Sequence, residues 1–266
     1  MRTNKGIESE TGNLYYDCFS VFDKNQWYYQ GKLLADQLGL TSEQVKGKKC
    51  MDGGCGHGSL AYVLNEMGAS EVFAVDLKPC PKEDQFKNSP NVHFIEGSLL
   101  ELSFSDAEFD LVVSSGVIHH TVDPEKAFSE MIRVLKPEGR MILGVYGKHG
   151  LFPWCLWVGR VFTVKIKLVP RGLVSKIIDI LKLDPIWRYQ FLDYLYVPLL
   201  KRYTQKEVID LFLKYKMQNP QRISNINTEK ARAYRRNKTS YSYDYRSLLS
   251  RILFGHGFIV VAGTKK

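Results

Sequence analysis

A glycine-rich run is the part of this sequence best suited to holding a small ligand against the backbone. Asp52 ends a short apolar stretch and is followed by Gly53, Gly54 and Gly56. Glycine lets the chain turn tightly and approach a ligand closely, and a helix that begins after the turn presents free N–H groups. The run lacks the third glycine of a dinucleotide-binding turn, because position 59 is serine. It predicts a binding turn but does not by itself identify the ligand.

A second carboxylate stands where the ribose of a nucleotide would lie. Asp76 follows the apolar residues 72–75 and comes 24 positions after Asp52. A carboxylate at the tip of the second strand of a βα unit is placed to accept hydrogen bonds from both ribose hydroxyls. The alternative is that Asp76 only begins a turn, but its spacing from the glycine run favours a nucleoside ligand.

Two adjacent histidines, His119 and His120, follow the apolar run that leads to residue 118. Histidine suits proton transfer because its unperturbed pKa lies near neutrality. His119 is the preferred candidate for a base because it is the first to leave the expected strand. A packing or helix-capping role is an equal alternative for each of the two. His57, which follows the glycines, is expected to line the ligand pocket and not to perform chemistry.

The elements that must position these residues follow from the hydrophobic pattern. Short apolar runs alternate with helix-period segments from Lys48 to Lys148, which is typical of βα units around a parallel sheet. Helix boundaries are marked by Gly68, by Asp123 with Pro124, and by a capping box that opens at Thr204. The expected strands are residues 49–51, 72–75, 92–95, 111–113, 141–145 and 257–262, and residues 222–226 are expected to pair beside the last of them.

Four sequence blocks in this order resemble the class I methyltransferases, in particular the small-molecule group typified by ubiquinone and menaquinone biosynthesis. The resemblance covers roughly residues 45–148, and its blocks are residues 52–58, 74–76, 104–112 and 133–139. It implies an α/β fold with a Rossmann-like seven-stranded sheet, mostly parallel with the last strand antiparallel. Helices would cover both faces, with a helical insertion after the fifth strand. It also implies S-adenosyl-L-methionine as cofactor and S-adenosyl-L-homocysteine as product.

The same resemblance implies which residues meet the cofactor. Asp52 and the glycines would face its methionine part, Asp76 the ribose and Leu77 the adenine. Ser98 stands where the family usually has an aspartate that bonds the adenine amino group. The loop after the fourth strand would lie beside the sulfonium. The full set of expected cofactor-binding residues is Asp52, Gly53, Gly54, Gly56, Asp76, Leu77, Ser98, Leu99, Ser115 and Gly116.

Methyl transfer is a direct displacement, so the protein has to align nucleophile, methyl carbon and sulfur and to exclude water. A base is needed only if the acceptor arrives protonated, and His119 or His120 is the candidate for that task. No metal site is expected, because the five cysteines form no Cys-x-x-Cys pair and have no partnered histidine cluster.

The domain organisation is expected to have one catalytic domain with additions. Residues 1–47 read as a helical aromatic cap and residues 48–266 as the methyltransferase domain, with a helical lid at 149–200 and a basic, tyrosine-rich segment at 228–251. The apolar lid favours a bulky or hydrophobic acceptor. Its aromatic side chains are expected either to line an acceptor pocket or simply to pack the lid: Trp154, Trp157, Trp187, Tyr189, Tyr194 and Tyr196.

Charge is distributed unevenly along the chain. Residues 1–150 hold 15 Lys and Arg against 21 Asp and Glu, whereas residues 151–266 hold 22 against 7. The C-terminal part therefore favours an anionic partner, such as an acidic group on the acceptor, a nucleic acid, acidic lipid or an acidic carrier protein. The oligomeric state is left open.

Transfer to an acceptor oxygen is the preferred reaction, and carbon or nitrogen is less favoured. RNA methylation through the basic segment is the main alternative, although the motifs for methylating base amino groups or pyrimidine carbons are missing. Arginine methylation of proteins, a nicotinamide dehydrogenase and a non-enzymatic cofactor-binding scaffold are weaker alternatives.

We expect the protein to be cytoplasmic, because no leader pattern or run of about 18 uninterrupted apolar residues is present. The nearest candidate, residues 151–169, contains three cationic side chains and is compatible with lying on a membrane but not with crossing it.

Overall fold

A computed structural model describes residues 4–20, 22–78, 84, 89–181, 185–223, 248, 252 and 257–266. Its centre is one sheet with the strand order β3-β2-β1-β4-β5-β7-β6. The strands are β1 (Lys49–Gly53), β2 (Glu71–Asp76), β3 (Val92–Glu96), β4 (Phe109–Ser115), β5 (Leu135–Tyr146), β6 (Met217–Arg222) and β7 (Phe258–Lys265). Only β7 runs against its neighbours, pairing antiparallel with both β5 and β6. The expected Rossmann-like, mostly parallel seven-stranded sheet is confirmed.

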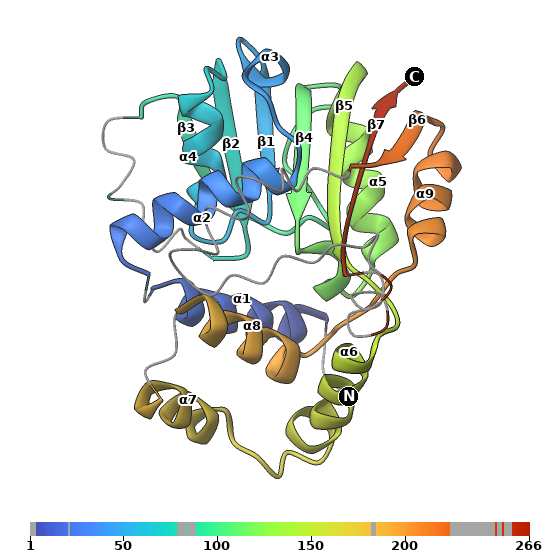
Figure 1. Ribbon diagram of the computed structural model, residues 1–266. Coiled ribbons are helices and arrows are strands. Elements are labelled where there is room, and N and C mark those ends of the chain that lie inside the picture. Colours follow the sequence, from blue (N-terminus) through green and yellow to red (C-terminus); the bar gives the residue numbers. More distant parts are fainter. Residues whose placement is uncertain are drawn as a thin grey trace.

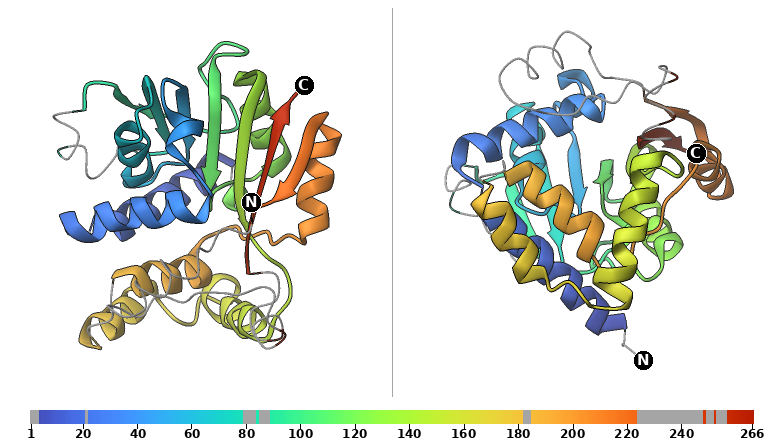
Figure 2. Two further views of the ribbon diagram at one scale, coloured as in Figure 1. Left: turned by 45° about the horizontal axis from the view of Figure 1, so that its top comes forward. Right: turned by 60° about the horizontal axis from the view of Figure 1, so that its bottom comes forward.

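The parallel strands all end at one edge of the sheet. In Figure 1 this edge faces a layer of helices that lies below the sheet. The layer consists of α1 (Asn4–Ser20), α6 (Leu151–Arg160), α7 (Arg171–Ile180) and α8 (Pro185–Tyr196). Seen from below, these helices lie together across the strand ends (Figure 2). Ligands of open α/β sheets bind at the carboxyl ends of the strands, so this layer is placed to roof a site.

Helices on the two faces of the sheet enclose two apolar cores. On one face α5 (Pro124–Val134) and α9 (Gln205–Lys214) bury Phe128 and Phe212 against β4 and β5. On the other face α2 (Lys24–Gln37) and α4 (Ser59–Glu66) bury Leu38 and Leu64. The described chain also contains the short helix α3 (Ser42–Val45) and the 3₁₀ turn η2 (Ile118–His120). A π-helical turn, η3 (Val161–Lys165), continues α6.

The helix boundary signals in the sequence are confirmed. The Asp123 carboxylate accepts a hydrogen bond from the Lys126 N–H, with proline in the first turn of α5. Thr204 and Glu207 form the predicted capping box of α9. Gly68 follows α4 with a φ of 90°, in the left-handed region that only glycine adopts without strain.

Two boundaries differ from the sequence prediction. Leu135, which continues the apolar period of α5, is already extended and begins β5, a strand of 12 residues that starts before Pro137. The strand beside β7 is Met217–Arg222, which shares only Arg222 with the expected residues 222–226, and residues 224–226 lie outside the described residues. Its residues Gln218, Asn219 and Gln221 are polar because β6 is an edge strand, so the hydrophobic alternation that marks an inner strand is missing.

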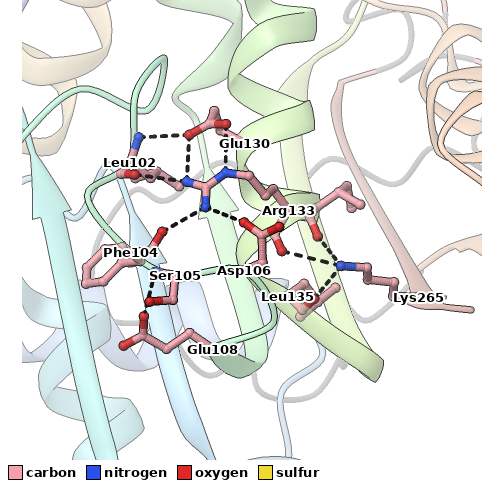
Figure 3. A network of polar contacts seen from close by, with 10 residues as sticks. Leu102, Phe104, Ser105, Asp106, Glu108, Glu130, Arg133, Leu135 and Lys265 are labelled. Atoms are coloured by element: carbon pink, nitrogen blue, oxygen red, sulfur yellow. Dashed lines mark hydrogen bonds and ion pairs between the residues drawn. The ribbon is translucent and has the colours of Figure 1, made fainter.

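An arginine network closes the opposite edge of the sheet, where the strands begin (Figure 3). Arg133, near the end of α5, donates to the carbonyl oxygens of Leu102 and Phe104 and to the carboxylates of Asp106 and Glu130. Leu102, Phe104 and Asp106 precede β4, so the network joins the loop before β4 to α5. Two of the resemblance blocks, residues 104–112 and 133–139, therefore meet in a structural contact away from the expected ligand edge.

Candidate cofactor site

The turn between β1 and α4 has a shape that requires its glycines. Gly54 and Gly56 have φ values of 82° and 55°. A Cβ on Gly54 would come within 2.2 Å of the Val117 side chain, and one on Gly56 within 2.5 Å of the Phe19 ring. Both distances are shorter than real side-chain contacts, so the turn has room for backbone only.

Two neighbouring elements hold the turn in place. The N–H groups of Gly54 and Cys55 both donate to the carbonyl of Val75, at 2.7 and 3.0 Å. From α2, the buried Trp27 indole donates to the carbonyl of His57 at 2.6 Å. The end of β2 and the second helix thus fix the backbone on either side of Gly56.

Asp76 is tied to this turn by a direct hydrogen bond. The Gly56 N–H donates to Asp76 Oδ2 at 2.8 Å. Burial raises the pKa of Asp76, and hydrogen bonds from the N–H groups of Gly56, Leu77 and Lys78 oppose that effect. The carboxylate accordingly keeps a fixed orientation at the tip of β2, as a ribose ligand would require.

A cavity with about 700 Å³ of empty space lies at the carboxyl ends of the strands. Its wall includes nine of the residues singled out in the sequence: Gly54, Gly56, Asp76, Leu77, Ser98, Leu99, Ser115, Gly116 and His120. Asp52, Gly53, His57 and His119, which were also singled out, are not among the residues that line it. Parallel strands bring the first set together because they end at one edge.

Helix α1 closes the cavity with residues that the sequence pattern did not reveal. Glu8, Thr11, Gly12 and Phe19 line it beside Tyr15, which is one of the aromatic residues of the expected cap 1–47. α1 has no strong amphipathic period to mark an inner face, so its inward residues could not be chosen from the sequence.

The most informative contact of α1 is with Ser98. The Ser98 hydroxyl donates to Glu8 Oε1 at 2.6 Å and accepts from the Leu100 N–H at 3.2 Å. Ser98 and Glu8 both line the cavity. A carboxylate is therefore present close to the position where the sequence offered only a serine, but it comes from the cap helix.

Asp52 lies behind the glycine turn and is only 2% exposed. Its Oδ2 has no hydrogen-bond partner among the described residues. Burial and the nearby charge of Asp76 raise the pKa of Asp52 to about 7. A buried carboxylate oxygen that lacks a hydrogen-bond partner can accept a hydrogen bond from a ligand or pair with a positively charged group on it.

The two histidines differ in their surroundings. His119 is fully buried, and neither of its ring nitrogens has a hydrogen-bond partner among the described residues. Burial and the neighbouring His120 hold the pKa of His119 well below its ordinary value. His120, whose ring lines the cavity, is the better candidate base, so the cavity geometry reverses the preference for His119 drawn from the sequence.

A fully buried carboxylate, Asp193 of α8, organises the surroundings of His120. Asp193 accepts hydrogen bonds from the hydroxyls of Tyr15, at 2.5 Å, and Tyr146. Its Oδ1 lies 3.3 Å from His120 Nε2, while His120 Nδ1 lies 2.9 Å from the carbonyl of Leu199. Four separate elements meet at this carboxylate. Sequence analysis missed Asp193 because only the folded chain brings α8 to the strand ends.

A second cavity, with about 1640 Å³ of empty space, opens beside α6. Trp154, Trp157 and Tyr194 from the predicted acceptor set line it. Tyr196 instead donates to the carbonyl of Val169. The side chains of Trp187 and Tyr189 lie outside the described residues, as does the basic segment 228–251 apart from Leu248. A role for that segment in binding nucleic acid or another acidic partner stays a prediction.

Comparison with known proteins agrees with this geometry. Residues 51–143 match the family described as a methyltransferase domain. A demethylmenaquinone methyltransferase of Renibacterium salmoninarum is 28% identical over 138 residues, 52% of this chain and 55% of that one. Human mitochondrial arginine-hydroxylase NDUFAF5 is 33% identical over 106 residues, 38% of this chain and 30% of that one. The chain thus spans about half or less of the length of these relatives.

The fold also matches solved structures. A 1,6-didemethyltoxoflavin-N1-methyltransferase of Burkholderia thailandensis, solved with S-adenosylhomocysteine, superposes with a TM-score of 0.55 at 15% identity, covering 98% of this chain and 87% of that one. The sheet topology and the family match over residues 51–143 are those of a methyltransferase domain with a Rossmann-like fold. Its matched sequence relatives include the menaquinone type.

The environment of Asp52 predicts a conflict between stability and ligand binding. A carboxyl whose pKa is raised on folding keeps its proton between about pH 4 and its folded pKa of about 7 and ionises above it. The unfolded state ionises already near pH 4, so the stability contributed by Asp52 should fall as pH rises from about 4 to about 7 and change little above that. Asp52→Asn should remove that loss and raise the free energy of unfolding of the ligand-free protein at pH 8 by about 1–3 kcal/mol, as measured by urea denaturation.

The matched control for this measurement is Glu101→Gln, which changes an exposed carboxylate after β3 that has no ion pair among the described residues. It should leave the pH dependence of wild type in place. An Asp52→Asn protein that loses stability as steeply as wild type between pH 5 and 7 would show that Asp52 is not the titrating group.

Proposed function

We propose that this protein binds S-adenosylmethionine in the cavity under α1 and transfers its methyl group to an oxygen of a bulky, hydrophobic acceptor. The observation that carries the proposal is the meeting of Asp76, the glycine turn and the His120 loop on the wall of one cavity. Asp76 would receive the ribose hydroxyls, and Asp52 would lie nearest the amino group of the methionine part. When bound, the cofactor supplies a methyl group activated by attachment to positively charged sulfur.

The protein's part in such a displacement is alignment, exclusion of water and uptake of one proton. The acceptor oxygen forms a bond to the methyl carbon while the sulfur keeps the electron pair of the bond that breaks. The acceptor proton would pass to His120. Burial lowers the pKa of His120, and the charge of Asp193 opposes this effect only in part, so the imidazole is neutral at pH 7 and can accept a proton. With Nδ1 bonded to Leu199, Nε2 is the basic nitrogen, and its protonation would create an ion pair with Asp193.

The second cavity supports an amphiphilic acceptor that carries an anionic group. The described residues that line this cavity include no carboxylate and four cations: Lys148, Arg160, Lys201 and Arg202. Arg160 is held by the carbonyls of Tyr194 and Val197, both at 2.8 Å, so its guanidinium has a fixed place on the wall. Tyr194 stacks on Tyr146 with ring centroids 4.8 Å apart, which links this cavity to the His120 network.

The test of the proposed reaction is transfer of labelled methyl from S-adenosylmethionine to a panel of hydroxylated aromatic compounds that carry alkyl chains with and without an acidic group. We expect label on oxygen, with kcat/KM rising with pH through the lowered pKa of His120. His120→Gln should reduce kcat by about 10²–10⁴-fold with little change in the KM for the cofactor, because general-base catalysis is worth that much.

Substitution of a half-exposed histidine on β3, His93→Gln, is the control and should leave kcat unchanged, because His93 lines neither cavity. Label found only on carbon or nitrogen would contradict oxygen as the acceptor atom. A His120→Gln enzyme with the wild-type kcat and pH profile would exclude His120 as the base.

Glu8 is proposed as the group that recognises the adenine amino group, in the role that the resemblance assigns to an aspartate at position 98. Glu8→Gln should weaken binding of S-adenosylhomocysteine by about 10–100-fold in a calorimetric titration, the usual value of a hydrogen bond to a charged group. The inosine analogue of that ligand, which lacks the amino group, should bind wild type and Glu8→Gln equally. If Glu8→Gln weakened binding of both ligands equally, Glu8 would only stabilise the position of α1 and would not recognise the amino group. Glu10→Gln on the same helix is the control.

A further inference from the structure

The segment from α6 to α7 presents an unusual amount of apolar surface to solvent. Leu168 and Ile180 are 68% and 77% exposed. A soluble protein rarely leaves so many large apolar side chains together in water without a binding role. The exposed set, which we name the docking face, is Leu151, Trp154, Trp157, Phe162, Ile166, Leu168, Leu173, Ile177, Ile180 and Leu181.

Helix α7 shows that this exposure is not the ordinary outer side of an amphipathic helix. Its inner side is already apolar, because Ile178 is buried and Val174 packs against the cluster formed by α1 and α8. Leu173, Ile177 and Ile180 are exposed at intervals of four and three residues, which places them on one outward face. The helix therefore has two apolar faces, and only one of them is used within the protein.

The charges interleaved with the docking face are almost all positive. Residues 151–181 contain five Lys and Arg and one acidic residue, Asp179. Lys165, Lys167 and Lys176 are exposed, and none of them has an ion pair among the described residues. Arg171 is paired with Asp17 of α1 at 2.6 Å. The surface thus combines apolar side chains, two tryptophans and free cations.

We propose that the docking face binds the surface of an anionic phospholipid bilayer. Large apolar residues with lysines around them are typical of elements that lie in the membrane interface, where cations meet acidic headgroups and apolar side chains enter the acyl boundary. Helix α7 and the chain that joins α6 to it carry most of this face and lie farther from the sheet than α1 and α8 do (Figure 1), so a flat surface can approach them. No helix in the described part of the chain is long and apolar enough to cross a bilayer.

The second cavity opens next to the docking face, so membrane binding would bring its mouth to the bilayer. Trp154 and Trp157 belong both to the docking face and to the wall of the cavity. A membrane-bound protein would therefore hold the cavity mouth at the level of the lipid headgroups. An amphiphilic molecule could enter from the bilayer with its anionic end among the four cations of the wall. Docking itself does not depend on the proposed methyl transfer.

The experiment is co-sedimentation of the full chain with vesicles of phosphatidylcholine alone or of phosphatidylcholine with phosphatidylglycerol. We expect binding to the anionic vesicles only, with weakening as salt screens the charges. The double variant Ile166→Ser, Leu168→Ser and the double variant Lys165→Glu, Lys167→Glu should each reduce the partition coefficient by at least about tenfold. Trp154 and Trp157 provide a second readout, because their fluorescence should be quenched by brominated lipid.

The controls remove an exposed leucine and an exposed lysine elsewhere. Leu213→Ser on α9 and Lys126→Glu on α5 should bind as wild type does, and all variants should keep the wild-type thermal midpoint since the changed side chains are exposed. Absence of wild-type binding to anionic vesicles would overturn the proposal, as would equal loss in the controls. Self-association that the Ile166→Ser, Leu168→Ser variant abolishes, without vesicle binding, would assign the face to a second copy of the chain instead.

Discussion

The candidate site depends on the hydrogen bond between the Gly56 N–H and Asp76, at 2.8 Å. It joins the turn after β1 to the tip of β2, and it is possible only because Gly56 adopts a φ of 55° with no side chain toward Phe19. The same turn is bonded to Val75 and Trp27 on either side. The cavity, the orientation of Asp76 and the buried state of Asp52 all follow from this one arrangement.

Two buried carboxylates at this site lower the stability of the folded protein when they are ionised. Asp52 and Asp76 are neighbouring carboxylates at the ends of adjacent strands, and both have raised pKa values because they are taken out of water. An isolated fold would be more stable with neutral groups at these positions. Perturbed acids in a cavity are typical of functional sites, where a ligand supplies the missing donors. The proposed cofactor would do so with its ribose hydroxyls and its amino group.

The parts of the site that could be predicted from the sequence are those fixed by strand order. Gly54, Asp76, Ser98 and Gly116 each follow a strand, and parallel strands end at one edge, so their meeting follows from the hydrophobic pattern alone. The assignment of these residues to a cofactor came from the resemblance, not from the pattern.

Contributions from the helical layer could not be predicted. Glu8 and Asp193 reach the site from α1 and α8, and nothing in their local sequence indicates which way these helices face. The ranking of His119 above His120 was unreliable for the same reason, since it used position along the chain and not the partner that α8 brings. The edge strand β6 was misplaced because its polar residues carry no alternation.

The central claim is that the cavity under α1 holds S-adenosylmethionine and not a dinucleotide. Calorimetric titration of the wild-type protein with S-adenosylhomocysteine, repeated with NAD⁺, tests it most directly. We expect one site for S-adenosylhomocysteine with a Kd in the micromolar range, which corresponds to a binding free energy of about −8 kcal/mol, and no heat of binding with NAD⁺. Binding of NAD⁺ in its place, or no binding of either ligand by the folded protein, would contradict it.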